Sequence, residues 1–205
     1  MHATQRVNYD AVMLKTLERL GDEKPLLLLH CCCAPCSSHV LNVLCSRFKI
    51  LIHFANSNIY PPEEYDKRLA ELYRYTDAAG LAGSVGFVQS DYSHENFLNA
   101  VSGTENEPEG GARCALCFEY RLGCAARAAK SAGAEFFTTT LTVSPHKNSD
   151  LLNRTGLRLA EEYGVKFLCS DFKKHDGYKK STELCRLYGI YRQNYCGCEF
   201  SVNNS

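Results

Sequence analysis

Short apolar runs alternate along this chain with longer stretches in which apolar residues recur at helical spacing. The first run, Leu26–Leu29, is apolar at every position, as in a strand buried on both faces of a parallel sheet. β-Branched and aromatic residues dominate Glu135–Leu141, which also favours a strand. The pattern predicts five strands, at residues 26–29, 49–57, 84–89, 135–141 and 165–170.

Helical spacing fills most of the sequence between these strands. Tyr9–Leu20 is one such stretch, with apolar residues at Val12, Leu14, Leu17 and Leu20. Pro35 suits the first turn of a helix that runs to about Phe48. Further helices are predicted within 58–80, 92–101, 114–133 and 144–164, and the longest loop at 102–113.

Strands that alternate with helices predict a doubly wound, mostly parallel α/β sheet of the Rossmann-like or HUP-like kind. We expect a single domain over residues 1–205, with a helical extension at 1–24 and a cysteine-bearing segment at 191–205 that closes a metal site. Ligands of such sheets bind outside the carboxyl ends of the strands. The segments HCCCAPC, ANSNIY and SPHK each follow a predicted strand, so we expect them to meet at that edge.

Composition and charge narrow the class of protein. Hydrophobic residues make up 45% of the 205 residues and charged residues 22%, as in globular proteins, and the formal net charge is zero. A neutral total gives no support to strongly basic, sequence-blind nucleic-acid binding. No apolar run reaches the ~20 residues of a membrane span, and the N-terminus lacks the apolar core of a signal peptide. We therefore expect a cytoplasmic protein with no membrane partner.

Twelve cysteines are the most unusual feature of the composition. Thiols of a reducing compartment serve metals or catalysis more often than disulfides. Four isolated cysteines lie within predicted helices or strands and are expected to be small buried hydrophobes: Cys45, Cys124, Cys169 and Cys185. The other eight are clustered: Cys31, Cys32, Cys33, Cys36, Cys114, Cys117, Cys196 and Cys198.

The clusters lie roughly 80 residues apart, whereas zinc ribbons place their knuckles about 15–20 residues apart. Such a site is assembled only by the complete fold, which favours a catalytic centre over a local structural one. Thiolate-rich sites suit zinc and iron–sulfur clusters alike, so the spacing leaves the metal open. The chain lacks both the radical-SAM pattern C-x3-C-x2-C and the SGGxDS-type pyrophosphate loop of ATP-dependent tRNA thiolases.

Six segments, in this order, resemble the QueH family of epoxyqueuosine reductases. They are HCCCAPCSSHVL, NSNIYPPEEYDKRL, GGARCALCFEYRL, FFTTTLTVSPHKNSDLL, FKKHDGY and YGIYRQNYCGCEFS, and the resemblance spans about residues 8–201. It implies an oxidoreductase of tRNA processing that performs the last step of queuosine biosynthesis. The family reduces the epoxide of epoxyqueuosine, at the wobble position of tRNA, to the alkene. The family pattern is closer to YNPNI where this chain has ANSNI, which weakens any role for the residues just before Asn58.

The resemblance also implies a cofactor set: a [4Fe–4S] cluster, an adjacent mononuclear iron and no cobalamin. Seven cysteines match the family's ligand positions, which suffices for four cluster ligands and three iron ligands. We assign Cys32, Cys114, Cys117 and Cys196 to the cluster, and Cys33, Cys36 and Cys198 to the iron. Under this hypothesis the iron polarises the epoxide C–O bond as a Lewis acid, and the cluster passes on electrons from an external low-potential donor.

Proton donors and tRNA contacts are predicted at the same edge. We name His146, Lys147 and Tyr191 as catalytic candidates, because the first two lie on the SPHK loop and the third flanks the last cysteines. A local excess of basic residues between 173 and 192 predicts phosphate contacts despite the neutral total. The predicted nucleic-acid-binding residues are Arg113, Lys173, Lys174 and Arg192.

Two alternatives from other classes stay open. An iron–sulfur-dependent tRNA thiolase would share the fold and the cluster, but it would require ATP. A zinc-stabilised RNA-binding module, or a simple electron carrier, would not act on the modified base at all.

Overall fold

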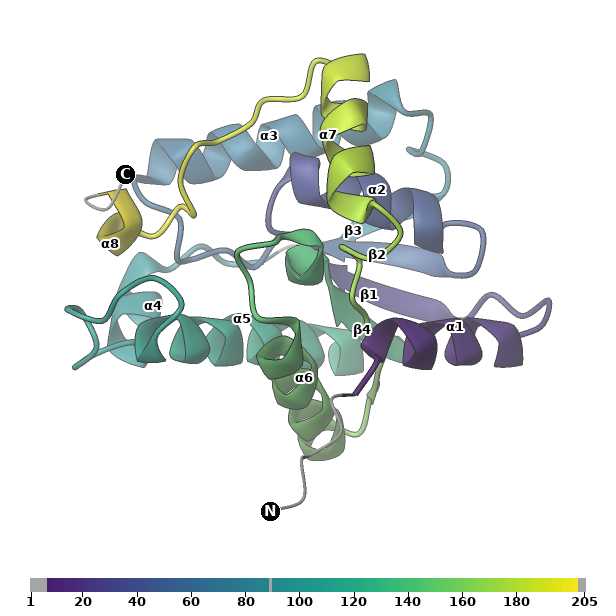
Figure 1. The fold of residues 1–205 in the computed structure, drawn as a ribbon, viewed down its shortest axis with the longest axis horizontal. Coiled ribbons are helices and arrows are strands. Elements are labelled where there is room, and N and C mark those ends of the chain that lie inside the picture. Colours follow the sequence, from purple (N-terminus) through teal and green to yellow (C-terminus); the bar gives the residue numbers. More distant parts are fainter. Residues whose placement is uncertain (1–6, 89, 203–205) are drawn as a thin grey trace.

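The computed structural model describes residues 7–88 and 90–202. Its centre is a sheet of five strands in the order β3-β2-β1-β4-β5, and every neighbouring pair is parallel (Figure 1). The strands are β1 Leu26–His30, β2 Lys49–His53, β3 Val85–Val88, β4 Phe136–Thr139 and β5 Lys166–Phe167. This order is doubly wound, because the chain runs outward from β1 to β3 and then returns to the other side of β1 at β4. The predicted fold class is confirmed.

Helices cover both faces of the sheet. In the view of Figure 1, α2, α3 and α7 lie above it, and α4, α5 and α6 lie below. The helices are α1 Tyr9–Arg19, α2 Ala34–Leu44, α3 Pro62–Ala78, α4 His94–Ala100, α5 Ala112–Ser131, α6 Ser149–Tyr163, α7 Gly177–Leu187 and α8 Glu199–Val202. Pro35 lies in the first turn of α2, as predicted. None of the helices in the described ranges combines the length and apolar character that a membrane span requires.

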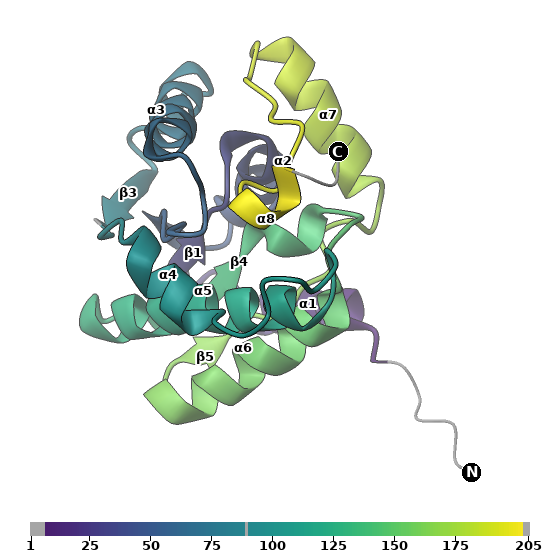
Figure 2. The ribbon, with the colours of Figure 1, turned by 90° about the vertical axis from the view of Figure 1, so that its left-hand side faces the viewer.

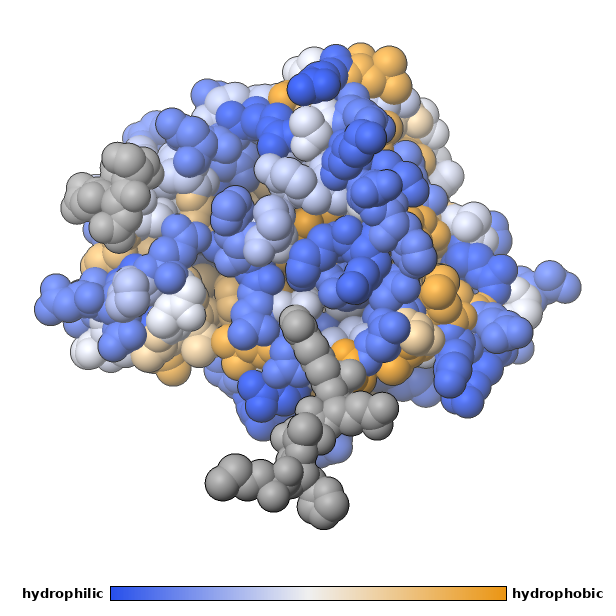
Figure 3. Space-filling view, in the orientation of Figure 1, coloured by the Kyte–Doolittle hydropathy of each residue, from blue (hydrophilic) through white to orange (hydrophobic). Residues whose placement is uncertain are grey.

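Two core clusters form on opposite faces of the sheet because successive strand residues point to opposite sides. Leu27 and Leu29 join the cluster with α2, α3 and α7, whereas Leu28 joins the cluster with α5 and α6. On the outside, the side of the molecule seen in Figure 3 is mostly hydrophilic, and hydrophobic side chains show as separate small groups. Most apolar side chains are therefore buried against the two faces of the sheet.

Four predicted elements differ in detail. Helix α1 buries Tyr9, Met13 and Leu17, whereas Val12 and Leu14 are exposed, because the buried stripe follows a spacing of four residues. The fourth strand ends at Thr139, where Thr140–Val143 turns into a 3-10 helix, η1. The second strand ends at His53, and the predicted strand 165–170 is a regular strand only over β5.

The carboxyl ends of β1, β2 and β4 meet at one edge of the sheet, as the parallel registers require. Cys32 lies where β1 and β4 diverge: its backbone N–H donates to Thr140 Oγ1 at 3.2 Å. The C-terminal segment returns to the same edge, where Tyr60 N–H donates to the Gly197 carbonyl oxygen at 2.8 Å. Figure 2 shows α8 beside this edge, between α3 and α5. The topology thus collects segments that are far apart in sequence.

Candidate metal centre and substrate cavity

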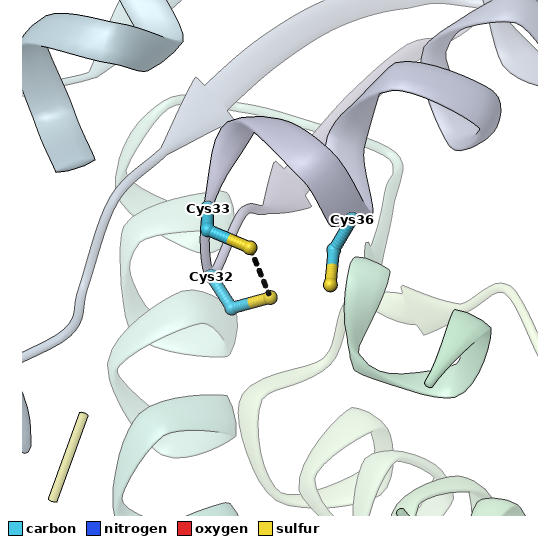
Figure 4. A group of neighbouring side chains, drawn as sticks. All are labelled: Cys32, Cys33 and Cys36. Atoms are coloured by element: carbon cyan, nitrogen blue, oxygen red, sulfur yellow. Dashed lines mark hydrogen bonds between the residues drawn. The ribbon is translucent and has the colours of Figure 1, made fainter. Parts of the chain in front are cut away.

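Three thiols form a compact group between β1 and α2. Cys32 and Cys33 follow the strand, and Cys36 lies in the first turn of the helix. Their sulfur atoms all lie within 4.8 Å of one another, and the Cys32 and Cys33 sulfurs are 3.8 Å apart. Figure 4 shows the three sulfurs pointing toward a common space. This is the donor arrangement that a thiophilic metal requires.

The three thiols shift one another's pKa values. Hydrogen bonds from Cys33 and Cys36 lower the pKa of Cys32 well below its ordinary value, and the positive charge of Arg121 adds to the effect. The hydrogen bond to Cys32 raises the pKa of Cys33 to about 12, and it raises the pKa of Cys36 as well. The trio therefore favours the thiolate form at Cys32, which accepts hydrogen bonds from the thiols of Cys33 and Cys36.

A second group consists of the cysteines at 114, 117, 196 and 198. Burial raises the pKa of Cys117 to about 11, and the nearby charges of Cys196 and Cys198 contribute. Burial likewise raises the pKa of Cys198, with contributions from Cys196 and Cys114. Cys117 and Cys198 also share one buried cluster with Phe97 and Val101. Helix α5 and the C-terminal segment therefore bring these thiols into electrostatic contact, although in residues 7–88 and 90–202 only the trio at 32, 33 and 36 has its sulfur atoms within 4.8 Å of one another.

Arg121 of α5 is a buried cation between the two thiol groups. Only 3% of its surface is exposed, and one guanidinium nitrogen lies 4.0 Å from Cys117 Sγ. Another donates to Asn56 Oδ1, and Asn56 Nδ2 donates to the Cys31 carbonyl oxygen at 2.8 Å. Burial lowers the pKa of Arg121, but the charges of Cys117, Cys32 and Cys196 outweigh burial and raise it. A permanent positive charge thus faces both groups.

Lys147 provides a second cation at the thiols. Its ammonium group donates to Cys196 Sγ at 3.1 Å and to Glu109 Oε1 at 2.9 Å. Its side chain is 10% exposed. Burial lowers the pKa of Lys147, but the charge of Cys196 and the hydrogen bond to Glu109 outweigh it, so the pKa is raised. Lys147 is therefore held protonated next to a candidate metal ligand.

A cavity of about 440 Å³ opens from the thiols toward solvent, within the range of small-molecule sites. Cys32, Cys36 and Cys196 lie in its wall, and polar side chains make up most of the rest. Those side chains include Asn58, Arg68, Glu109, Arg121, His146, Lys147, Arg192 and Gln193, with Tyr178 and Tyr195 as aromatic neighbours.

The predicted catalytic residues divide into two groups. His146 and Lys147 both line the cavity. Tyr191 does not belong to its wall, since its hydroxyl donates to Glu64 and its ring lies under the Lys67 ammonium, 3.6 Å from the ring centroid. The position of Tyr191 therefore favours a packing role, and its catalytic role stays a prediction.

The predicted tRNA-binding residues also differ in position. Arg192 is exposed at the cavity and donates to Tyr178 and Thr182. Lys174 is exposed away from the cavity wall, and Lys173 pairs with Asp171 at 2.9 Å. Arg113 is 3% exposed and donates to the carbonyl oxygens of Thr104, Glu105 and Glu107. Its guanidinium thus organises the loop at 102–111, and a phosphate contact there has no support from this position.

Two buried arginines of the site are absent from the predicted residues. Arg68 of α3 and Arg121 of α5 each occupy a position on the buried stripe of an amphipathic helix. The signal was present in the sequence: an arginine on an apolar helix face is rarely buried without a partner. Asn58 and Gln193, which also line the cavity, carry no comparable signal in the pattern.

These features define a class of protein: a doubly wound α/β protein with a thiol-rich candidate metal centre that opens into a polar cavity. A family model described as "Epoxyqueuosine reductase QueH" matches residues 27–204. The chain belongs to the epoxyqueuosine reductase QueH family and is therefore an oxidoreductase. The resemblance seen in the six sequence segments is confirmed.

Three relatives illustrate the similarity, each named epoxyqueuosine reductase QueH. The one from Streptococcus pyogenes serotype M1 is 42% identical, over 98% of this chain and 81% of its own length. The one from Staphylococcus epidermidis is also 42% identical, over 97% of this chain and 86% of its own length. The one from Thermotoga maritima is 36% identical, over 86% of this chain and 90% of its own length. These comparisons give no support to a thiolase or to a zinc-stabilised RNA-binding module.

Proposed function

We propose that this protein reduces the epoxide of epoxyqueuosine in tRNA to the alkene of queuosine. The observation that carries the proposal is the union of a thiol-rich centre and a polar cavity in one site. Removal of the epoxide oxygen as water consumes two electrons and two protons. The reaction therefore requires a redox centre, proton donors and space for a nucleotide, and the cavity has residues suited to each.

The thiol donor set suits iron, because thiolates are the usual ligands of iron–sulfur clusters. We propose a [4Fe–4S] cluster and a mononuclear iron, without cobalamin, as the resemblance implies. The sequence-based division separates Cys32 from Cys33 and Cys36. The closeness of these three sulfurs supports a different division, in which they hold the iron and the cysteines at 114, 117, 196 and 198 hold the cluster. Bound there, the two groups would supply one-electron transfer from an external low-potential donor and Lewis acidity.

The protein's own residues supply the protons and position the substrate. Lys147 is the proposed proton donor, since its ammonium lies in the cavity beside Cys196, and Glu109 fixes its position. His146 is exposed on the same loop and is suited to relay protons from solvent. Arg192 at the cavity, with Lys173 and Lys174 nearby in sequence, is proposed to contact tRNA phosphates. Binding should then weaken as salt rises.

Two measurements test the proposal. Iron, acid-labile sulfide and zinc are determined on anaerobically purified protein, and about four sulfides with about five irons per chain are expected. The loaded protein is then given tRNA that bears epoxyqueuosine, with a low-potential reductant and without ATP. Nucleoside mass spectrometry should show the loss of one oxygen atom. Zinc without sulfide, or an ATP requirement, would contradict the proposal.

A further inference from the structure

Buried polar atoms without partners concentrate around the cavity. In residues 7–88 and 90–202, seven buried side-chain nitrogen or oxygen atoms lack a hydrogen-bond partner, and one of them, Asp171 Oδ1, instead lies 2.9 Å from the Lys173 ammonium. Four of the seven belong to residues of the cavity wall: Asn58 Oδ1, Arg68 Nη2, Arg121 Nε and Gln193 Oε1. Unpaired buried polar groups are destabilising and rare in native proteins. Their concentration in one wall indicates that a bound molecule supplies the missing partners.

Asn58 and Arg68 are the most deeply buried residues among them, since they are 1% and 2% exposed. Two of the three guanidinium nitrogens of Arg68 are already engaged. Nε donates to Glu64 Oε1 at 2.7 Å, and Nη1 donates to the Cys196 carbonyl oxygen at 3.1 Å. Gly197 lies against the same group, where an added Cβ would be 2.8 Å from Nη1. The guanidinium is therefore fixed in orientation, and Nη2 is its one nitrogen without a hydrogen-bond partner.

The charge balance of this pair determines which ligand it suits. Glu64 neutralises the charge of Arg68 through a charge-assisted hydrogen bond. Arg68 Nη2 and Asn58 Oδ1 therefore offer one N–H donor and one amide oxygen without surplus charge. A phosphate would bring negative charge to Asn58 Oδ1, which can only accept. A neutral group that sets an acceptor beside a donor satisfies both atoms, and the edge of a nucleobase is such a group.

We infer that Asn58 and Arg68 recognise the edge of a nucleobase that is extruded from a single-stranded RNA loop into the cavity. Asn58 Oδ1 accepts from the donor of the base, and Arg68 Nη2 donates to its acceptor. Enzymes that act on a base take it out of the stack and bind its hydrogen-bonding edge in this manner. Tyr195, in the same wall, has the Arg68 guanidinium over one face of its ring and adds an aromatic side chain to the site. The inference rests on the proposed function, to which it adds the recognition residues.

A binding cycle tests the inference separately from the reaction. Two anticodon stem–loop RNAs are compared, one with a base at the wobble position and one abasic there, against the wild-type holoprotein and Asn58→Ala. Wild type should bind the base-bearing loop about 10-fold more tightly than the abasic loop, as expected for buried hydrogen bonds. Asn58→Ala should lose this preference and bind the abasic loop as wild type does. Equal weakening for both RNAs, or an unchanged preference, would overturn the inference.

Two further variants exclude a structural explanation. Asn42→Ala, at an exposed position of α2 outside the cavity wall, should keep the full preference for the base. Arg68→Lys keeps the positive charge near Glu64 but removes the Nη2 donor, and it should reduce the preference as Asn58→Ala does. Iron content is measured for every variant, because Arg68 also contacts the Cys196 backbone.

The outcomes also separate this inference from the proposed function. If the holoprotein shows a base-dependent preference but reduces no epoxide, the proposed reaction fails and base recognition stands. If it reduces the epoxide, and Asn58→Ala does so with unchanged KM and kcat, the reaction stands and the inference fails. If both hold, the KM of Asn58→Ala for the modified tRNA should rise about 10-fold, with a smaller change in kcat.

Discussion

Arg68 donates a hydrogen bond to the carbonyl oxygen of Cys196, a residue 128 positions further along the chain. The contact joins α3 to the segment that carries the last two cysteines. Glu64 holds the other side of the guanidinium, and the Tyr195 ring lies 5.0 Å from it. One buried cation thus links α3 to the segment that carries the candidate metal ligands Cys196 and Cys198.

Replacement of Arg68 by methionine should therefore destabilise the protein and release the C-terminal segment. It leaves Glu64 and the Cys196 carbonyl without their partner, and breaking a buried pair costs about 3 kcal/mol. Urea unfolding and the rate of proteolysis near residue 196 measure the two effects. Arg154→Ala is the control, because its pair with Asp150 is 67% and 39% exposed and should contribute only about 0.5 kcal/mol.

Gly197→Ala should lower the metal content of the protein. Gly197 has φ of +111°, and a Cβ there would lie 2.8 Å from Arg68 Nη1 and 3.1 Å from Ile59 Cγ1. Such strain costs about 1–3 kcal/mol and displaces the backbone between Cys196 and Cys198. Iron per chain should fall to about half or less in Gly197→Ala. Gly83→Ala has open space around the new Cβ and should retain wild-type iron.

The clustered and isolated thiols should differ in their response to substitution. Cys33→Ser removes one sulfur from the trio at 32, 33 and 36 and should abolish most of the mononuclear metal binding, since a three-ligand site becomes a two-ligand site. Cys45→Ser changes a half-buried thiol of the core and should leave metal content unchanged. Iron and sulfide analysis after anaerobic reconstitution compares the two proteins. Equal loss in both would contradict a metal role for the trio.

Arg121→Gln should make the bound redox centre harder to reduce. Arg121 places a buried positive charge near Cys117, Cys32 and Cys196, and a positive charge stabilises the added electron. The midpoint potential should shift by about 60 mV to more negative values, a tenfold change in a one-electron equilibrium. Arg127→Gln, at an exposed position of the same helix, should shift it little. A redox titration followed by absorbance or EPR distinguishes them.

His53 should make the protein less stable as the pH falls from about 6.5 toward 4. Burial lowers its pKa to about 4, so the folded state keeps a neutral imidazole while the unfolded chain binds a proton. Stability is therefore lost between the unfolded and folded pKa values, by up to about 3 kcal/mol. His53→Gln should reduce this loss in urea unfolding of metal-free protein, and the part that comes from the buried His30 should remain. Asn42→Gln, at an exposed position without a titratable group, should keep the wild-type pH dependence.

The sequence by itself determined the strands, the parallel doubly wound sheet and the edge at which the site forms. The reason is local: apolar runs, helical spacing and Pro35 each act through neighbouring residues. Clustered cysteines at the ends of predicted strands were sufficient to indicate a metal centre, because topology alone brings those ends together. The six motif segments identified the family, because each is a contiguous stretch of sequence that can be compared without knowledge of the fold.

Only the tertiary structure decided how these parts meet. It grouped Cys32 with Cys33 and Cys36, since three sulfurs within 4.8 Å depend on the turn between β1 and α2. Arg113 is buried against the loop at 102–111, whereas Arg68 and Arg121 are buried at the cavity. The sequence does not distinguish them, because all three are basic residues within helices. Burial and unpaired hydrogen-bonding atoms are properties of packing between distant segments, and no local pattern encodes them.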